Sequence, residues 1–284
     1  MPNPIRYTDL FIDFDDTLYD TYGNAVVALR ETFEEFHLER YFSDPQVFYD
    51  AYWAANIDLW TRYSKGEITR DYLIVERFRR PLSRSARFPA CDIPTLGSVG
   101  SYVDNPTQGS ESPNADIPTL GSVGSYADNP TPENVDSYVE KLCLNINDRF
   151  LDYCSSKPGV IDGAHELMDY LKGKGYRMHM CSNGFHEVQY KKLDACGLRD
   201  HFDTIILSED AGANKPSKAF FDYAFQRSGA SPATTIMIGD NLRTDIVGAK
   251  EAGLNTILFN RWDVDPEGIP TFTVSSLLQI KDIL

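Results

Sequence analysis

The feature that most constrains the fold is a regular alternation of strand-like and helix-like stretches after residue 160. Short apolar runs are typical of buried strands, and amphipathic stretches that end at glycine are typical of helices. Strand-like runs cover residues 8–14, 176–183, 203–210, 233–240 and 255–260, and helix-like stretches cover residues 162–175, 186–197, 217–229 and 242–253. Repeated strand–helix units predict an α/β fold with a doubly wound parallel sheet, whose ligand crevice lies at the carboxyl ends of the strands.

A region of different character follows the first strand. Residues 20–80 read as helices rich in aromatic residues, for instance at 45–66 and 67–78, and residues 132–155 read as another helix. The sequence therefore predicts two parts: an α/β core made of residues 1–19 and 157–284, and a mainly helical cap, residues 20–156, inserted after the first strand.

The predicted cap contains a duplicated segment. Residues 92–107 recur almost unchanged as residues 116–131, with Val103 replaced by Ala127. Two copies are too few for a solenoid, which needs about three stacking units. The segment is either a Gly/Ser/Pro-rich surface stretch without a catalytic role, or a lid or docking loop for an unknown protein partner. The sequence leaves both open.

The net charge and the hydropathy of the chain limit the classes of partner that the protein could bind. Lys and Arg total 27 against 42 Asp and Glu, which gives a formal net charge of −15 and disfavours a nucleic acid polymer. No apolar run reaches the ~18 residues of a membrane span, and the N-terminal residues do not resemble a signal peptide. The cysteines show no C-x-x-C spacing, typical of reduced thiols. We therefore expect a cytoplasmic protein without membrane contact.

Carboxylates follow the first predicted strand. Asp13, Asp15 and Thr17 take alternate positions in DFDDT, and alternate side chains of an extended backbone share a face. Two carboxylates this close resist joint ionisation unless a cation lies between them or one keeps a proton. The spacing therefore predicts a metal site, a shared proton, or both.

A second acidic group follows a later strand, where Asp240 and Asp245 lie in GDNLRTD. Oxygen ligands without neighbouring histidine or cysteine suit Mg²⁺, which proteins usually hold through one or two carboxylates, water and substrate phosphate. We therefore expect Mg²⁺ as the cofactor of the protein and a small phosphorylated molecule as its substrate.

Anion-binding groups end two further segments. Ser182 and Asn183 close a strand-like run and offer a hydroxyl, an amide and backbone N–H groups, and Lys215 offers a positive charge. Each signal is weak alone, because acidic residues at strand ends often cap the next helix and a single lysine is usually solvated. Their order along the chain is the specific signal.

This ordered set resembles the haloacid dehalogenase-like (HAD) superfamily, whose four motifs match DFDDT, CSNG, Lys215 and GDNLRTD. That family combines a Rossmann-like core with a cap, here of the helical C1 type after the first strand. The stretch SNGFHEVQYKKLDACGLRDHFDTIILSEDAGANKPSKAFFDYA, the ending DPEGIPTFTVSSL and the cap sequence LWTRYSKGEITRDYL are similar to the bacterial pyrimidine 5′-nucleotidase branch. The resemblance implies a phosphatase for nucleoside 5′-monophosphates.

The resemblance also implies residue roles. Asp13 would be the nucleophile that forms an aspartyl phosphate, and Asp15 would protonate the leaving oxygen and then deprotonate the hydrolytic water. Mg²⁺ would be bound by the Asp13 carboxylate, the Asp15 backbone carbonyl and Asp240, with Asp245 supporting them from behind. Thr17 would orient the first loop, and the phosphoryl group and substrate would contact Ser182, Asn183, Gly184, Phe185 and Lys215.

The four motifs leave alternatives open. A phosphatase or phosphomutase for a sugar phosphate would use the same residues. A non-enzymatic alternative is a binding module that accepts a phosphoryl group, or a scaffold that works through the duplicated segment. The cap aromatics Trp53, Trp60 and Tyr63 could stack on a nucleobase or pack inside the cap.

Overall fold

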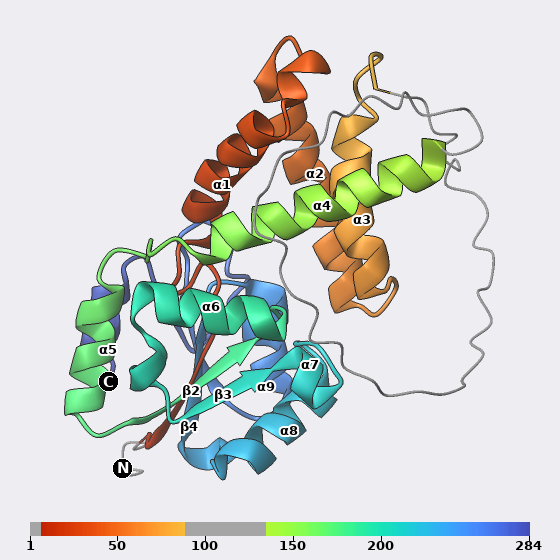
Figure 1. Ribbon diagram of the computed structural model, residues 1–284. Helices are drawn as coiled ribbons and strands as arrows, with labels where there is room; N and C mark the ends of the chain where they lie inside the picture. The colour runs from red at the N-terminus through yellow and green to blue at the C-terminus, as the bar shows by residue number, and fades with distance from the viewer. Residues whose placement is uncertain (1–6, 89–134) are drawn as a thin grey trace, which may run out of the picture.

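The computed structural model describes residues 7–88 and 135–284, and the duplicated segments at 92–107 and 116–131 lie outside the described residues. A six-stranded sheet with strand order β3-β2-β1-β4-β5-β6 forms the core (Figure 1). All neighbouring strands are parallel. The strands are β1 (Asp9–Ile12), β2 (Arg177–Ser182), β3 (Thr204–Leu207), β4 (Thr235–Gly239), β5 (Asn255–Phe259) and β6 (Phe272–Val274). The predicted doubly wound α/β fold is confirmed.

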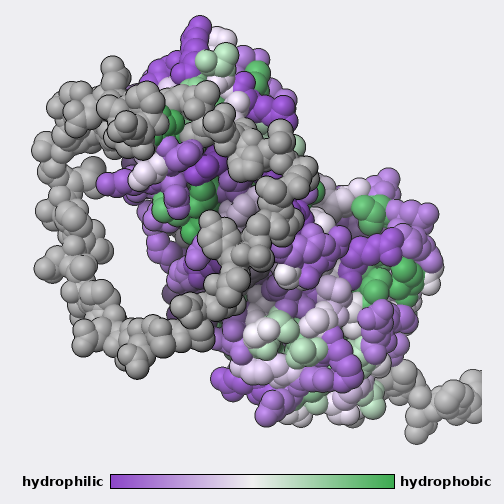
Figure 2. Space-filling view, turned by 90° about the vertical axis from the view of Figure 1, so that its right-hand side faces the viewer, coloured by the Kyte–Doolittle hydropathy of each residue, from purple (hydrophilic) through white to green (hydrophobic). Residues whose placement is uncertain are grey.

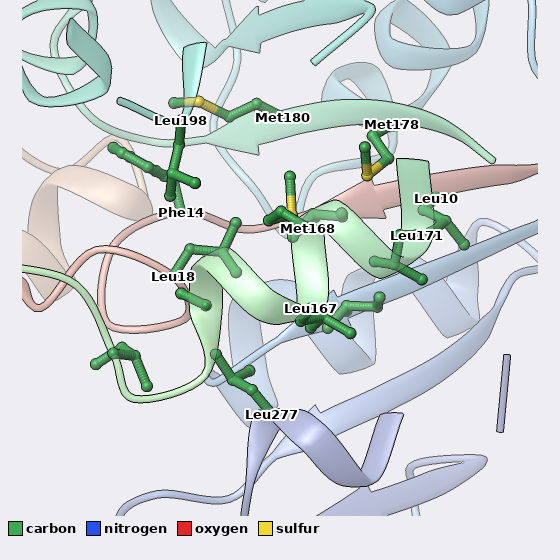
Figure 3. Packing of buried hydrophobic residues seen from close by; sticks show 14 of the residues in the cluster. Leu10, Phe14, Leu18, Leu167, Met168, Leu171, Met178, Met180, Leu198 and Leu277 are labelled. Atoms are coloured by element: carbon green, nitrogen blue, oxygen red, sulfur yellow. The ribbon is translucent and has the colours of Figure 1, made fainter. Parts of the chain in front are cut away.

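Both faces of the sheet are covered, which explains why its strands read as continuous apolar runs. Side chains alternate along β1, so that Leu10 and Ile12 face one hydrophobic cluster and Phe11 faces another. Figure 3 shows the first cluster, where leucine and methionine side chains of α5 (Ala164–Gly173) lie against those of β1 and β2. On the other face, α8 (Lys218–Ser228) contributes Phe220 and Phe221.

The remaining helices of the core are α6 (His186–Cys196), α7 (Ser208–Ala211) and α9 (Gly248–Glu251). Of these, α6 lies close to the range predicted for it, residues 186–197. Two predictions differ from the structure. The strand predicted at 203–210 ends at Leu207, because residues 208–211 already form α7, and the helix predicted at 242–253 begins as a π-helix over Leu242–Val247. The short edge strand β6 was not predicted.

The predicted cap region, residues 20–156, is helical in its described parts and lies above the sheet (Figure 1). Its helices are α1 (Thr21–Glu35), α2 (Pro45–Ser64), α3 (Arg70–Leu82) and α4 (Val135–Ser155). All four bury side chains in one shared cluster, including Phe33, Tyr52, Phe78 and Phe150. Helix α3 starts later than predicted because Thr69 caps it, with its hydroxyl accepting a hydrogen bond from Tyr72 N at 3.2 Å.

The chain passes between the two parts at neighbouring segments. The Tyr19 hydroxyl donates to the carbonyl oxygens of Cys154 and Lys157, each at 2.7 Å, and Asn24 Nδ2 donates to Gly159 O at 2.8 Å. These bonds join the end of the first core segment to the start of the second. The domain boundaries at residues 19 and 157 stay a prediction.

The face seen in Figure 2 is mostly hydrophilic, with hydrophobic residues in small separate groups. Within the described ranges, no helix is both long enough and apolar enough to span a bilayer. The cytoplasmic location stays a prediction.

Candidate active site

The predicted acidic residues meet where the strand order of the sheet reverses. Asp13 follows β1 and Asp240 follows the neighbouring strand β4. One carboxylate oxygen each from Asp13, Asp240 and Asp245 lie within 4.8 Å of one another. Parallel strands end at the same edge of a sheet, so side chains more than 200 residues apart in sequence converge there.

Asp13 is almost fully buried and is held from both sides. Lys215 Nζ donates to Asp13 Oδ1 at 2.7 Å, and the Thr17 hydroxyl donates to Asp13 Oδ2 at 2.7 Å. Burial is the main cause that raises the pKa of Asp13 to about 7, the charges of Asp245 and Asp15 add to it, and Lys215 only partly opposes them. Asp13 is thus a carboxylate whose charged form needs more positive charge than the described residues supply.

Lys215 supplies the fixed positive charge of the site. It is 1% exposed, and its Nζ lies 2.8 Å from Asp245 Oδ1 and donates to Cys181 O at 2.6 Å, in addition to Asp13. Burial alone would lower the pKa of this lysine, but the two carboxylates outweigh burial and raise the pKa. Lys215 therefore stays charged at physiological pH and links the ends of β1, β2 and β4.

Asp240 has no cationic partner among residues 7–88 and 135–284. Its Oδ2 accepts a hydrogen bond from Trp262 Nε1 at 3.2 Å, and its backbone N–H donates to Thr17 Oγ1 at 3.0 Å. In the described part of the chain, no lysine or arginine nitrogen lies within 4.0 Å of its carboxylate. Burial and the charges of Asp13 and Asp245 raise the pKa of Asp240 well above its ordinary value.

The Asp245 carboxylate is bonded to both a lysine and a backbone N–H group. Besides Lys215, it accepts a hydrogen bond from Asn241 N at 3.1 Å. A Cβ atom at Gly239 would lie 2.4 Å from Asp245 Oδ2, so glycine at this position is what lets the carboxylate approach the end of β4.

Asp15 sits in a separate polar cluster. Its carboxylate accepts hydrogen bonds from Thr21 Oγ1 and Gln189 Nε2, each at 2.5 Å, and forms an ion pair with the buried Lys192. Burial would raise the pKa of Asp15, but Lys192, Thr21 and Gln189 together outweigh it, so the pKa lies below its ordinary value. Asp15 is therefore a negatively charged group near neutral pH.

The end of β2 and the loop after it form hydrogen bonds to Gln189 of the Asp15 cluster and to the backbone of Lys215. Ser182 Oγ accepts hydrogen bonds from Gly184 N at 3.0 Å and Gln189 Nε2 at 2.5 Å. The Asn183 amide pairs with the backbone of Lys215, donating to its carbonyl at 3.0 Å and accepting from its N–H at 2.8 Å. A Cβ atom at Gly184 would lie 2.2 Å from Gln189 Nε2, so glycine at this position gives Gln189 room to reach Asp15.

Phe185 is the residue that precedes α6. Its ring is 2% exposed, packs against Trp60 with ring centroids 5.3 Å apart, and is covered by the Arg70 guanidinium 4.2 Å above it. Arg70 also forms ion pairs with Glu187 and Glu209 of the core. Phe185 thus packs against the cap, and its role in substrate binding stays a prediction.

Several residues of the site were not singled out from the sequence. These are Thr21, Gln189, Lys192 and Trp262. A signal for two of them exists, because Gln189, Lys192 and Cys196 are spaced at 3 and 4 residues and share the buried face of α6. Polar residues on the inner face of a helix need a partner, and here the partner is Asp15.

Comparison with known proteins places the chain in a family. The family model described as haloacid dehalogenase-like hydrolase matches residues 10–253. The chain belongs to the haloacid dehalogenase-like hydrolases. The resemblance inferred from the motifs is confirmed.

Relatives of this HAD hydrolase include enzymes with named substrates. The Escherichia coli (strain K12) pyrimidine 5′-nucleotidase YjjG is 35% identical over 155 residues, 52% of this chain and 68% of YjjG. The glyceraldehyde 3-phosphate phosphatase of Methanothermobacter thermautotrophicus is 35% identical over 121 residues, 40% of this chain and 54% of that enzyme. A crystal structure of the Bacillus subtilis HAD-hydrolase YfnB bound to magnesium has a TM-score of 0.72, 26% identity, and coverage of 98% of this chain and 99% of YfnB.

The ion pair between Lys192 and Asp15 gives a prediction for stability. Replacing Lys192 with methionine is expected to lower the free energy of unfolding at pH 7 by about 1–3 kcal/mol, because breaking a buried pair leaves a charge uncompensated and partial exposure of Asp15 screens the loss. Since the folded-state pKa of Asp15 is lowered, the pair stabilises the fold above the unfolded-state pKa, about 4, and this contribution disappears as the pH falls further.

Urea unfolding of both proteins at pH 7 and at a pH well below 4 checks this expectation. Lys191→Met is the matched control, because Lys191 is 55% exposed and pairs with Asp152 on the surface. An equal loss at both pH values, or an equal loss in the control, contradicts the assignment of the effect to Asp15.

Proposed function

We propose that this HAD hydrolase is a Mg²⁺-dependent phosphomonoesterase that works through an aspartyl phosphate on Asp13. The observation that carries the proposal is the convergence of Asp13, Asp240 and Asp245 around Lys215 at the reversal of the strand order. Phosphoryl transfer needs little covalent assistance and depends mainly on positioning and charge neutralisation. A buried nucleophile next to a fixed lysine suits that reaction.

The donor set fits a divalent cation. Asp13, Asp240 and Asp245 bring three carboxylates together, whereas Lys215 is the one cation bonded to them in the described ranges. Burial, together with the charges of neighbouring carboxylates, raises the pKa of Asp13 and of Asp240, so added positive charge would favour their charged forms. Asp13 and Asp240, with the Asp15 backbone carbonyl, would hold Mg²⁺, which would supply positive charge beside the phosphoryl oxygens. The magnesium in YfnB supports this choice.

The residues would act in two displacements. In the first, an Asp13 carboxylate oxygen attacks phosphorus, the bond to the leaving oxygen breaks, and Asp15 gives that oxygen a proton. In the second, water attacks the phosphorus of the aspartyl phosphate, Asp15 takes the proton of the water, and inorganic phosphate leaves as Asp13 is restored. Lys215 keeps its charge throughout and neutralises the oxygens that crowd around phosphorus.

We assign the proton transfers to Asp15, which carries no proton near neutral pH before the reaction. Its lowered pKa makes it a carboxylate near neutral pH, which suits its role as base in the second displacement. Its role as acid in the first displacement requires prior proton uptake. We infer that Thr21, Gln189 and Lys192 fix the position of this carboxylate between the two steps.

The substrate proposed is a nucleoside 5′-monophosphate, with a pyrimidine base. The similarity to YjjG supports this class, and the similarity to the archaeal glyceraldehyde 3-phosphate phosphatase supports a sugar phosphate as the second candidate. Phosphate release from nucleoside monophosphates and sugar phosphates, with kcat/KM as the readout, tests the two. The highest value for a sugar phosphate would overturn the nucleotide proposal and leave the phosphatase proposal intact.

Removal of the metal gives a second test. We expect phosphate release to stop in excess EDTA and to return with Mg²⁺. Protons compete with the metal for carboxylates whose pKa is raised, so the Mg²⁺ concentration for half-maximal activity should rise as the pH falls below about 7, the pKa of Asp13.

A thermal measurement extends this test beyond activity. The Tm increase on adding Mg²⁺ should be larger at pH 8 than at pH 6, and Asp240→Asn should reduce it at both pH values, because Asp240 has no other cation in the described residues. Full activity in EDTA, or a Tm without response to Mg²⁺, contradicts the metal proposal.

A further inference from the structure

Three aromatic side chains lie together at the edge of the carboxylate site. Tyr22 is in the first turn of α1, Trp53 is in α2, and Trp262 is in the loop after β5. The ring centroids of Tyr22 and Trp262 are 5.7 Å apart in an edge-to-face arrangement, and those of Tyr22 and Trp53 are 4.8 Å apart. We refer to Tyr22, Trp53 and Trp262 as the aromatic platform.

The platform is joined directly to the proposed metal site. Trp262 Nε1 donates to Asp240 Oδ2 at 3.2 Å, so the indole ring begins one hydrogen bond away from the acidic cluster. The Arg261 guanidinium lies 4.4 Å from the centre of the Trp262 ring and forms ion pairs with Asp16 and Asp20. These contacts fix the indole beside the position that the phosphoryl group would occupy.

Two of the three platform rings are exposed, whereas Trp53 is partly buried against the hydrophobic cluster of the cap helices. Tyr22 is 43% exposed and Trp262 is 47% exposed. In contrast, Trp60 and Tyr63 pack with the buried Phe185 in a hydrophobic cluster that does not include the carboxylates. Large aromatic rings left exposed beside a catalytic site lack the contacts that would explain them as core residues.

We propose that the aromatic platform binds the nucleobase of the substrate by stacking and thereby sets the preference for nucleotides over sugar phosphates. This inference rests on the proposed function, because it assumes that the phosphoryl group binds beside Asp240. Every nucleobase has a π-face, and rigid aromatic rings bind it with little loss of side-chain freedom. A sugar phosphate without a base gains nothing from these rings.

The test compares two esters that share a phosphate and a ribose, uridine 5′-monophosphate and ribose 5-phosphate. In the wild type, kcat/KM for the nucleotide is expected to be the higher. The substitutions Trp262→Leu and Tyr22→Leu should each reduce the nucleotide-to-sugar ratio of kcat/KM by roughly 5- to 100-fold, mainly through KM, which is the range of one base–aromatic stack.

Two further variants separate stacking from other effects. Trp262→Phe keeps a ring but loses the hydrogen bond to Asp240, and we expect it to keep most of the ratio even if both activities fall. Tyr72→Leu is the matched control, because Tyr72 is also 43% exposed but contacts Arg62 of the cap. This control should leave the ratio unchanged.

A binding measurement makes the inference independent of turnover. In the Asp13→Asn background, calorimetry with Mg²⁺ should give tighter binding of uridine 5′-monophosphate than of ribose 5-phosphate, and Trp262→Leu should remove the difference. Equal affinities in that background, or an equal loss for both esters on Trp262→Leu, overturn the platform as a base site. If no ester is hydrolysed but the affinity difference follows Trp262, the proposed function fails and the platform stands.

Discussion

Replacing Asp13 with asparagine is expected to reduce phosphate release by about 10⁴-fold or more, because an amide cannot form the acyl phosphate. Asn keeps the size of the side chain. Its Oδ1 can still accept a hydrogen bond from Lys215, and its Nδ2 can donate one to the Thr17 hydroxyl, which here donates to the second carboxylate oxygen at 2.7 Å. The loss should therefore appear in kcat, measured with a nucleoside monophosphate at saturating Mg²⁺.

The fold of Asp13→Asn is the control for this result. The pKa of Asp13 is raised to about 7, so its folded form favours the proton and its ionisation destabilises the metal-free fold. Stability from this group is present below pH ~4 and is lost as the pH rises through about 7. In EDTA at pH 8 the variant is expected to be at least as stable as the wild type. Activity within tenfold of the wild type contradicts the role of Asp13 as nucleophile.

Replacing Asp15 with asparagine is expected to lower kcat/KM by about 10²- to 10⁴-fold for a nucleoside monophosphate, the usual contribution of a positioned general acid. The loss should be much smaller for p-nitrophenyl phosphate, whose leaving oxygen needs no proton. This dependence on the leaving group is specific to the first displacement.

The second displacement can be followed in the same variant. With p-nitrophenyl phosphate, Asp15→Asn should show a burst of nitrophenol followed by slow turnover, because the base for water is missing while Asp13 is still phosphorylated. The surroundings of Asp15 also predict a stability cost, since the amide leaves Lys192 without its carboxylate partner. Equal losses of kcat/KM for both esters would contradict the proton-transfer role.

The candidate site shows which functional residues can be identified from a sequence and which cannot. DFDDT and GDNLRTD could be read as ligand-bearing loops because the residue types and their positions after strands are local features. The companions of Asp15 were not visible in this way, because Gln189 and Lys192 lie on a helix more than 170 residues later. Only the packing of α6 against the end of β1 shows that they face this carboxylate.

The aromatic residues show the same limit. Trp53, Trp60 and Tyr63 were equivalent candidates in sequence, since all lie in one helix, α2. In the structure Trp53 contacts Tyr22, which in turn contacts Trp262, whereas Trp60 and Tyr63 pack around the buried Phe185. Trp53 and Trp60 are about two helical turns apart along α2, so they meet different partners, and these partners come from distant segments of the chain.

The sequence by itself determined the fold class, the family and the acidic residues that lie at the strand ends, because apolar periodicity and short motifs are local properties of the chain. Only the tertiary structure decided which of these groups lie close enough to change one another's pKa. The burial that raises the pKa of Asp13 and the lysine that lowers the pKa of Asp15 both arise from neighbours brought close only by packing of the sheet and its helices. Electrostatic interaction depends on distance in space and on burial, and neither is written in the order of residues.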